Sequence, residues 1–142
     1  MELQIERMDP SLELPFYAHE DDAALDLPSA DDYIIGPGKS ESIRTGLKMA
    51  IPPGFVGLIW DRSGLAAKHS LHCLAGVIDS GYRGEISIVM VNLSDAEFAV
   101  QKGMRIAQIL IQPVQQCRIV EVDSLSTNTQ RGRGGFGSSG LH

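Results

Sequence analysis

The sequence predicts an all-β fold, a jelly-roll-like β-sandwich with one short helix. Most apolar stretches are short and rich in Ile, Val and Leu, and several alternate apolar and polar residues, as 42–51 do. This alternation is typical of strands that bury one face. Turn signals separate the stretches, at Gly36–Gly38, Pro52–Gly54 and Ser80–Gly81. Only Ser63–Ser70 has the character of a helix. Many strands joined by tight turns favour a sandwich or jelly roll.

Six segments are expected to form strands, because each is apolar and is bounded by turn residues. The segment Gly76–Glu85 reads as a β-hairpin, with Ser80 and Gly81 at its turn. The six expected strands are Leu3–Met8, Ser40–Ile51, Phe55–Trp60, Glu85–Leu93, Arg105–Val114 and Cys117–Val122.

The chain has 142 residues, enough for one domain with a real core. Residues 1–123 are expected to form the sandwich. The strand pattern stops at about residue 124, and Ser124–Gln130 is polar. We therefore expect residues 124–142 to be a flexible C-terminal arm that carries the glycine-rich end elsewhere.

Composition narrows the classes of function. The net charge of −6 argues against bulk binding of nucleic acid or of an anionic membrane, so any phosphate site must be local. No apolar run approaches the length of a membrane span, and the N-terminus lacks a signal-peptide pattern, so a cytoplasmic location is expected. Cys73 and Cys117 lie far apart, which favours reduced structural thiols over a redox or metal pair.

The C-terminal segment 131–140 (RGRGGFGSSG) is the most informative stretch. Glycines let backbone N–H groups approach an anion, arginines neutralise it, and serines add donors. Phe136 offers a flat face on which a base can stack. This segment has what is needed to close over a nucleoside polyphosphate, although the same composition is also typical of a disordered Gly/Ser tail.

Two more segments have a functional and a structural interpretation. The stretch 22–27 (DAALDL) lies in an acidic cluster from Glu20 to Asp32, where a carboxylate could hold a metal through water or simply be solvated. In 61–66 (DRSGLA), a strand ends and the short helix begins. Ser63 and the N–H groups that follow could bind phosphate there, or Ser63 could be an ordinary N-cap.

Two later segments complete the set. Asp79 follows an apolar pair in the hairpin, a position suited to a partly shielded base, and Tyr82 could pack flat on a sugar. A plain hairpin with a turn aspartate is the alternative. Arg105 and Gln108 lie in an apolar strand, where they need partners if buried, and an internal salt bridge would satisfy the arginine.

Taken together and in this order, the five segments resemble the motifs of the homotrimeric dUTPase family, the deoxyuridine triphosphate nucleotidohydrolases. The resemblance runs from about Glu20 to Gly140. Its strongest parts are RSGLA at 62–66, GVIDSGYRGE at 76–85 and RGxGGFGSSG at 131–140.

The resemblance implies roles for the phosphate side of a site. Asp26 matches the aspartate near the triphosphate and its Mg²⁺, which it touches indirectly through water while the triphosphate holds the ion. The phosphate ligands implied by the second and fourth motifs are Arg62, Ser63, Gly64, Arg105 and Gln108.

It also implies the base, the sugar contact and the closing tail. Asp79 matches the aspartate that activates the attacking water, and Tyr82 the aromatic that packs under deoxyribose and excludes a 2′-hydroxyl. Uracil is read mainly by the backbone around Gly76 and Ile78. The tail residues that close over base and γ-phosphate are Arg131, Phe136, Gly137 and Ser138.

The implied activity is hydrolysis of dUTP to dUMP and pyrophosphate, which limits uracil in DNA and supplies dUMP for dTMP synthesis. Such hydrolysis needs charge neutralisation, an in-line water and a base. The charge would be neutralised by Mg²⁺, Arg105, Arg131 and backbone donors, and Asp79 would act as the base. By resemblance the enzyme is a homotrimer in which the hairpin and the tail of one site come from different subunits. The four histidines have no metal-binding spacing and are read as surface or packing residues.

The chain departs from the family pattern at three places. Asp61 stands where many members have proline, and its charge is expected to oppose the phosphates. Segment 72–76 (HCLAG) lacks the asparagine that some members place near the base. Gly81 replaces a second aspartate, a variant that the family tolerates.

Three alternatives are weighed against this interpretation. A dCTP deaminase of the same superfamily would need a glutamate base where Val89 stands, and a second arginine in the motif where Gly64 and Leu65 follow Ser63. A non-catalytic nucleotide-binding regulatory trimer would not need both Asp79 and an intact tail. A P-loop ATPase is excluded because no lysine follows Gly137 and no helix has room to form.

Overall fold

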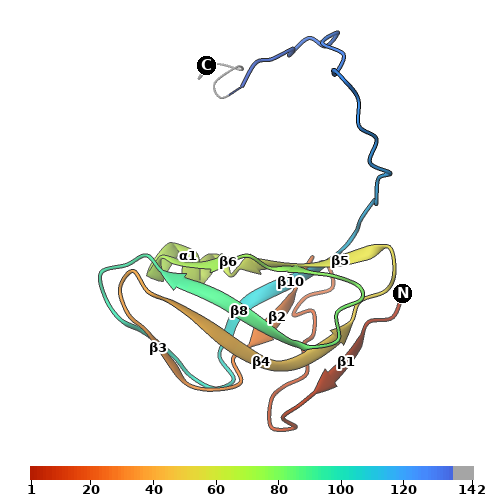
Figure 1. The fold of residues 1–142 in the computed structure, drawn as a ribbon. Coiled ribbons are helices and arrows are strands. Elements are labelled where there is room, and N and C mark those ends of the chain that lie inside the picture. The colour runs from red at the N-terminus through yellow and green to blue at the C-terminus, as the bar shows by residue number, and fades with distance from the viewer. Residues whose placement is uncertain (136–142) are drawn as a thin grey trace.

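The computed structural model describes residues 1–135 and contains two four-stranded sheets, a two-stranded ribbon and one short helix (Figure 1). The strands are β1 (Gln4–Arg7), β2 (Leu25–Pro28), β3 (Tyr33–Ile35), β4 (Ser40–Ala50), β5 (Phe55–Asp61), β6 (Leu71–Leu74), β7 (Val77–Ile78), β8 (Glu85–Asn92), β9 (Phe98–Val100) and β10 (Arg105–Pro113). The helix α1 spans Ser63–His69.

The two large sheets face each other as a jelly-roll-like sandwich, so the predicted fold class is confirmed. One sheet has the strand order β1-β4-β8-β6 and the other β2-β10-β5-β7, and β3 pairs with β9 in the ribbon. All the pairings are antiparallel. The second sheet matters most for function, because β2, β10 and β5 lie side by side and carry the first, fourth and second motifs.

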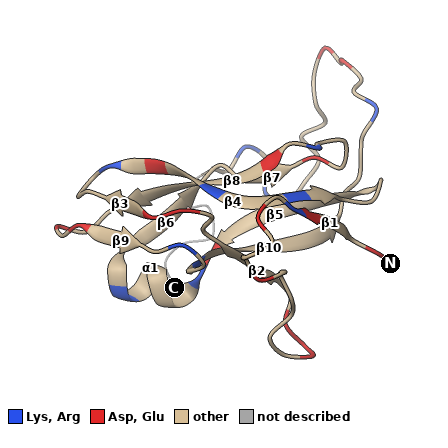
Figure 2. Ribbon diagram, turned by 90° about the horizontal axis from the view of Figure 1, so that it is seen from below, with Lys and Arg blue, Asp and Glu red and all other residues tan. Residues whose placement is uncertain are grey.

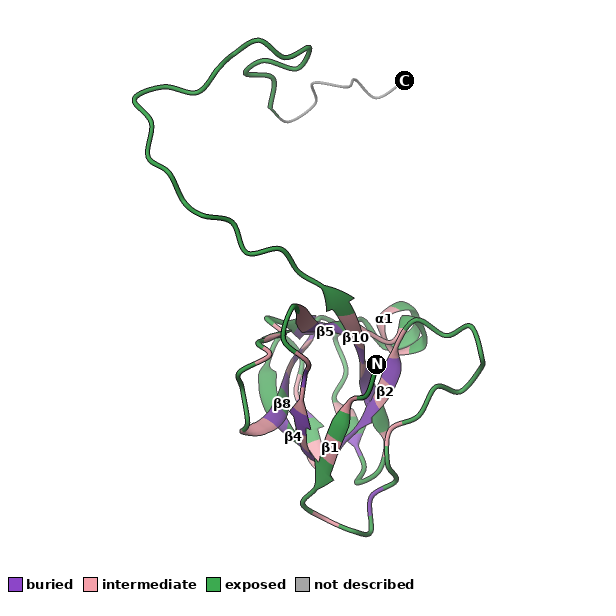
Figure 3. Cartoon of the chain, turned by 90° about the vertical axis from the view of Figure 1, so that its right-hand side faces the viewer, coloured by how far each residue is buried: buried purple, intermediate pink, exposed green. Residues whose placement is uncertain are grey.

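The core lies between the sheets, where alternate residues of the long strands point inward (Figure 3). In β8, for example, Ile86, Ile88 and Met90 are each about 1% exposed. The few buried polar side chains are satisfied by backbone groups: Thr45 Oγ1 donates to Ile86 O at 2.6 Å, and Asn92 Nδ2 donates to Ile35 O at 2.8 Å. Among residues 1–135 no buried side-chain nitrogen or oxygen lacks a hydrogen-bond partner, so the apolar core holds the two sheets in a fixed relation without a polar penalty.

A bulge in β4 fixes the start of β8. The register between these strands shifts between Arg44 and Lys48, and Gly46 there has φ +68°. The Glu85 carboxylate crosses to this bulge, accepting hydrogen bonds from Gly46 N at 2.9 Å and from Arg44 Nε at 3.1 Å. Glu85, the last residue of the third motif, is therefore structural.

The predicted hairpin at 76–85 is only partly correct. Its first arm, β7, pairs with β5, and its second arm, β8, pairs with β4 and β6, so the arms belong to different sheets. The alternative interpretation of Ser63 as an ordinary N-cap is not met either. Arg62 occupies the N-cap position with no side-chain capping bond, and Ser63 is the first helical residue.

The expected strand Cys117–Val122 is wrong. After β10 ends at Pro113, the chain leaves the sandwich and runs away from it as an extended segment (Figure 1). Ile119 is 95% exposed and Leu125 is 82% exposed. The segment has strand-like composition, but within residues 1–135 no neighbouring strand lies beside it to complete a ladder.

Acidic and basic residues are both scattered over loops and strands, and α1 carries basic but no acidic side chains (Figure 2). Within residues 1–135, no helix is both long and apolar enough to cross a membrane.

Candidate active site

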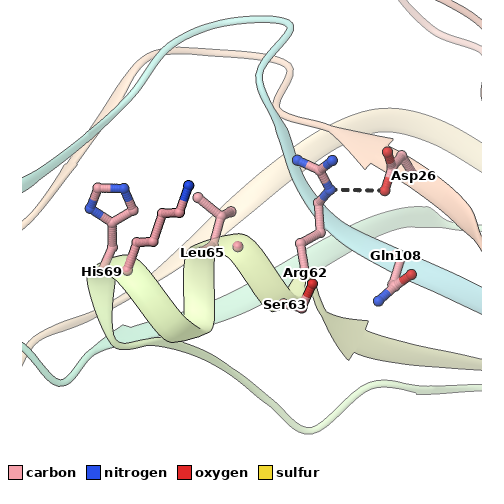
Figure 4. A pocket seen from close by; sticks show the side chains of 8 residues that line it. Asp26, Arg62, Ser63, Leu65, His69 and Gln108 are labelled. Carbon is pink, nitrogen blue, oxygen red and sulfur yellow. Dashed lines mark hydrogen bonds and ion pairs between the residues drawn. The ribbon is translucent and has the colours of Figure 1, made fainter.

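A polar cleft of about 350 Å³ lies between α1 and the end of the second sheet (Figure 4). The sheet and the chain entering the helix provide most of its polar groups, and α1 provides one wall. Its lining consists of Asp26, Arg62, Ser63, Gly64, Leu65, Lys68, His69 and Gln108. Five of the predicted phosphate-side residues are thus brought together from three separate motifs. We call this the phosphate cleft.

Asp26 organises the phosphate cleft. Its Oδ1 accepts from Arg62 Nε at 2.9 Å, and its Oδ2 lies 3.3 Å from Arg105 Nη1. Arg62 Nη1 also donates to Arg105 O at 3.0 Å. One half-buried carboxylate therefore orients two guanidinium groups, as the expectation of an internal salt bridge for Arg105 foresaw. With Lys68 beside them, the cleft has a net positive charge in an acidic chain.

The register of the sheet explains this convergence. On β10, Gln108 lies opposite Asp26 of β2 on one side and opposite Trp60 of β5 on the other. Gln108 Nε2 donates to the carbonyl of Asp61 at 2.6 Å, so its side chain is held at the end of β5. A shift of one residue would turn Gln108 to the other face of the sheet.

A second cleft, of about 270 Å³, lies between the separated arms of the third motif. Val77, Ile78, Asp79 and Tyr82 contribute from one side, and Glu85, Ile86 and Ser87 from the other. We call this the hairpin cleft. Because the arms do not pair with each other, their facing backbone groups can bind a planar hydrogen-bonding ligand.

Asp79 and Tyr82 are both exposed in the hairpin cleft. Tyr82 Oη donates to Glu85 O at 2.9 Å, and its ring lies so close to Gly84 that any side chain there would collide with it. The turn is closed by Tyr82 N donating to Asp79 O at 3.0 Å. The expectation that Asp79 is partly shielded is not met in this single chain.

A third, mainly apolar cleft of about 310 Å³ lies beside the end of β5, between Trp60 and Val77. Asp61 lines this cleft and not the phosphate cleft, so its carboxylate is turned away from the position where it was expected to oppose phosphates. Its Oδ2 lies 2.7 Å from His72 Nδ1, and its Oδ1 accepts from Cys73 N at 2.6 Å.

These contacts shift two pKa values. Burial raises the pKa of the Asp61 carboxyl, but hydrogen bonds from His72 and Cys73 lower it by more, so the net pKa lies below the ordinary value. Burial, together with the nearby Asp61 charge, raises the pKa of the Cys73 thiol to about 12. Cys73 is therefore an inert structural thiol.

The structure does not bring all of the predicted residues into one place. The phosphate and hairpin clefts share no lining residue. On β5, Ile78 lies opposite Gly57, five residues before Arg62. At the rise of a strand, this separates the clefts by roughly 16 Å along the sheet. Arg131 is exposed on the extended arm, with its Nε donating to Gly134 O at 3.0 Å. Phe136, Gly137 and Ser138 lie outside the described residues.

The sequence-based reasoning missed Lys68 and His69, which line the phosphate cleft. Lys68 follows Gly64 by four residues and so lies on the same face of α1, a signal that helical spacing could have provided. His69, read as a surface or packing residue, also packs against Phe98 with ring centroids 5.0 Å apart.

The donor set fits a metal ion that arrives with a polyphosphate. Among residues 1–135, no three His, Cys, Asp or Glu side chains cluster closely enough to hold a metal. Asp26 is the carboxylate of the phosphate cleft, and it is already engaged by two arginines. Such a carboxylate suits an indirect contact through water.

Comparison with known proteins agrees with this arrangement. The dUTPase family model matches residues 11–140. A deoxyuridine 5′-triphosphate nucleotidohydrolase of Clostridium kluyveri is 48% identical over 142 residues, covering 99% of both chains. One from Mycobacterium tuberculosis is 47% identical over 147 residues, covering 99% of this chain and 96% of the other.

Solved structures show the same fold with nucleotide and with metal. The Staphylococcus bacteriophage 80alpha dUTPase with dUpNHpp has a TM-score of 0.92 at 29% identity and covers 99% of both chains. A mutant dUTPase from phage phi11 of S. aureus, described as revealing the coordination of a structural Mg(II) ion, has a TM-score of 0.81 at 27% identity. That alignment covers 87% of this chain and 98% of the phage chain.

Proposed function

Because the chain belongs to the dUTPase family, we propose that it hydrolyses dUTP to dUMP and pyrophosphate. The observation that supports this most directly is the phosphate cleft, where Arg62, Ser63 and Gln108 meet in a positively charged pocket of an acidic chain. Guanidinium groups, a hydroxyl and an amide are suitable donors for a chain of phosphates. Arg105 adds a fourth ligand from the same sheet.

The hairpin cleft is the proposed site for the nucleoside. Uracil lies between the separated arms and is read by backbone groups of Ile78, which lines the hairpin cleft, and of Gly76, which directly precedes β7. Tyr82, held by its hydroxyl contact with Glu85, packs under deoxyribose and leaves no room for a 2′-hydroxyl. A buried donor left unpaired by a wrong base costs enough to discriminate strongly.

Asp79 is the proposed general base. It takes a proton from a water molecule that attacks the α-phosphate in line with the departing pyrophosphate. Arg62, Arg105 and Arg131 neutralise the charge that moves onto the leaving group. Mg²⁺ bound to the triphosphate, with Asp26 contacting it through water, would supply further neutralisation and orient the phosphates.

We further propose that a complete site is shared between the subunits of a homotrimer. The separation of roughly 16 Å between the two clefts along β5 supports this, because Asp79 cannot reach a phosphate held by Arg62 of its own chain. The extended arm from residue 114 has the reach to deliver Arg131, Phe136, Gly137 and Ser138 to another subunit. In this scheme the sandwich ends with β10 at Pro113 and the arm begins at residue 114, about ten residues before the boundary between 123 and 124 that the sequence predicts.

In the cell, this reaction would limit incorporation of uracil into DNA and supply dUMP for dTMP synthesis. The proposed place of action is the cytoplasm, and the proposed partners are dUTP and further copies of the chain, with no nucleic acid and no membrane.

The proposal is tested by assaying pyrophosphate release from dUTP, UTP, dTTP and dCTP with Mg²⁺ present and then removed by a chelator. We expect hydrolysis of dUTP that depends on Mg²⁺, with far slower hydrolysis of the other three. The exclusion of a 2′-hydroxyl by Tyr82 and of a 5-methyl group by the narrow hairpin cleft predicts this order. Comparable rates on UTP or dTTP would contradict it.

A further inference from the structure

Asp61 contacts several parts of the chain, and none of the residue roles proposed above accounts for these contacts. It is the last residue of β5 and directly precedes Arg62. Its two carboxylate oxygens contact His72 and Cys73 of β6, while its carbonyl accepts from Gln108 of β10. One residue thus contacts a wall of the phosphate cleft and the strand that leads to the hairpin cleft.

The chain turns a strained corner after β6. Ala75 has φ +60° and Gly76 has φ +115°, and a positive φ is costly for any residue with a Cβ. Pairing between β6 and β8 ends at Leu74 opposite Val89, so the corner has left the ladder of the first sheet. It leads directly into β7, whose two residues line the hairpin cleft. We call residues 74–76 the corner.

The corner is held from both sides by β5. Before it, Cys73 N donates to Asp61 Oδ1 at 2.6 Å. At its last residue, Ile59 N donates to Gly76 O at 2.8 Å. The first contact is made by a side chain and the second by the backbone. A charge-assisted hydrogen bond to a backbone N–H is among the stronger polar contacts in proteins.

On the basis of the function proposed above, we propose that Asp61 is a positioning residue that holds the corner so that Gly76 and Ile78 present their backbone groups to the base. Its carboxylate binds an N–H group of β6, the edge strand of the first sheet, one residue before the pairing with β8 ends. Asp61 does not touch the substrate, and its effect is transmitted through Cys73 N. His72 keeps the carboxylate aimed at that group.

The backbone carbonyl and the side-chain carboxylate of Asp61 have different partners, so a change of side chain should affect binding of the base and binding of the phosphates differently. The contact with Gln108 uses the backbone carbonyl and survives a change of side chain. The contact with Cys73 uses the carboxylate and does not. Replacement of the side chain should therefore loosen the base side of the site and leave the phosphate cleft intact.

The test measures binding of dUMP and of pyrophosphate separately, by titration calorimetry on the full-length chain. For Asp61→Ala we expect dUMP to bind about tenfold more weakly, as one lost polar contact predicts, and pyrophosphate to change by less than about twofold. In steady-state kinetics, KM for dUTP should rise about tenfold while kcat stays within about twofold. A variant that only destabilised the fold would weaken both ligands together.

Asp61→Asn is the matched control, because its side-chain oxygen can still accept from Cys73 N. It should restore dUMP binding to within about threefold of the parent. If Asp61→Ala does not fold, Asp61→Val takes its place, since a β-branched residue suits the end of a strand.

Unchanged dUMP binding in Asp61→Ala, an equal loss of pyrophosphate binding, or failure of Asp61→Asn to restore binding would each overturn the positioning role. These binding readouts do not require turnover. A parent chain that binds dUMP but releases no pyrophosphate from dUTP would instead count against the proposed function.

Discussion

At the scale of single residues, Asp79 is the proposed general base, and its side chain contributes little to the stability of the fold. It is exposed on a turn, and the turn is closed by its backbone carbonyl. Asp79→Asn should therefore keep the fold and the affinity for dUMP but lower kcat by roughly 10²–10⁴, the usual scale for a lost general base. Single-turnover hydrolysis together with a thermal melt measures both effects. Near-normal turnover in a folded variant would show that another group is the base.

Asp61 gives a prediction about stability and pH. Its folded-state pKa lies below the ordinary value of 3.8, so the ionised carboxylate stabilises the fold fully at neutral pH. That contribution is lost as pH falls from about 5 through the folded-state pKa. Asp61→Asn should be less stable than the parent by about 1 kcal/mol at pH 7, and the gap should narrow below about pH 4. Urea unfolding at a series of pH values measures it, and a gap that stays constant would contradict the assignment.

At the scale of elements, the corner before β7 allows a direct test of packing. A Cβ on Gly76 would lie 2.7 Å from Ile59 Cβ, whereas one on Gly38 would meet nothing within 4 Å. Both glycines have positive φ, +66° at Gly38 and +115° at Gly76, so each alanine substitution carries a backbone cost of about 1 kcal/mol, and this cost is larger at Gly76 because its φ lies outside the left-handed helical region. We expect Gly76→Ala to lose about 3 kcal/mol of unfolding free energy and Gly38→Ala about 1 kcal/mol. Equal urea midpoints would show that the corner tolerates the collision.

Long strands were predictable from sequence, whereas of the short ones at the two sheets and the ribbon only β1 (Gln4–Arg7) was expected, at 3–8. The segments expected at 40–51, 85–93 and 105–114 agree with β4, β8 and β10 to within a residue or so, because enough residues alternate to set a period. The strands β2, β3, β6 and β9 have three or four residues each, too few for a period, and tertiary pairing decides them. The separated arms of the third motif follow from which strands lie nearby, which local composition does not encode.

The candidate site shows the same division. The grouping of Asp26, Arg62, Ser63 and Gln108 follows the family motifs, and the register of β10 with its two neighbours explains it. The partners of Asp61 could not be foreseen, because His72 and Cys73 approach it across a boundary between sheets. Lys68 lies two residues beyond the RSGLA motif, so the motif positions alone do not identify it as a lining residue.

At the scale of the whole molecule, the separation of the clefts and the extended arm make assembly testable by mixing inactive chains. A chain truncated after Asn128 should fold, since the removed residues contain almost no core-forming side chains, and should be nearly inactive without its arginines and Phe136. Asp79→Asn should also be nearly inactive. Co-refolding the two should restore activity. In trimers mixed at random, about one quarter of the sites combine an intact Asp79 from one chain with an intact tail from another.

The control for mixing is the mass of the refolded species. Native mass spectrometry resolves trimers that contain one or two truncated chains, and each chain refolded alone gives the background rate. Mixed trimers without recovered activity would show that the hairpin and the tail act within one chain.

Asp26 held between two arginines has a consequence for turnover. In the free enzyme this carboxylate already occupies the guanidinium groups, so an incoming anion must compete with it. A single weak charge, such as chloride, gains little by displacing it, whereas a triphosphate brings several charges at once. Once hydrolysis has divided those charges between two products, the Asp26 carboxylate again competes effectively for the guanidinium groups. Under the proposed function, Asp26 is therefore expected to act as a competing anion that keeps the empty cleft selective for polyphosphates and favours release of the products.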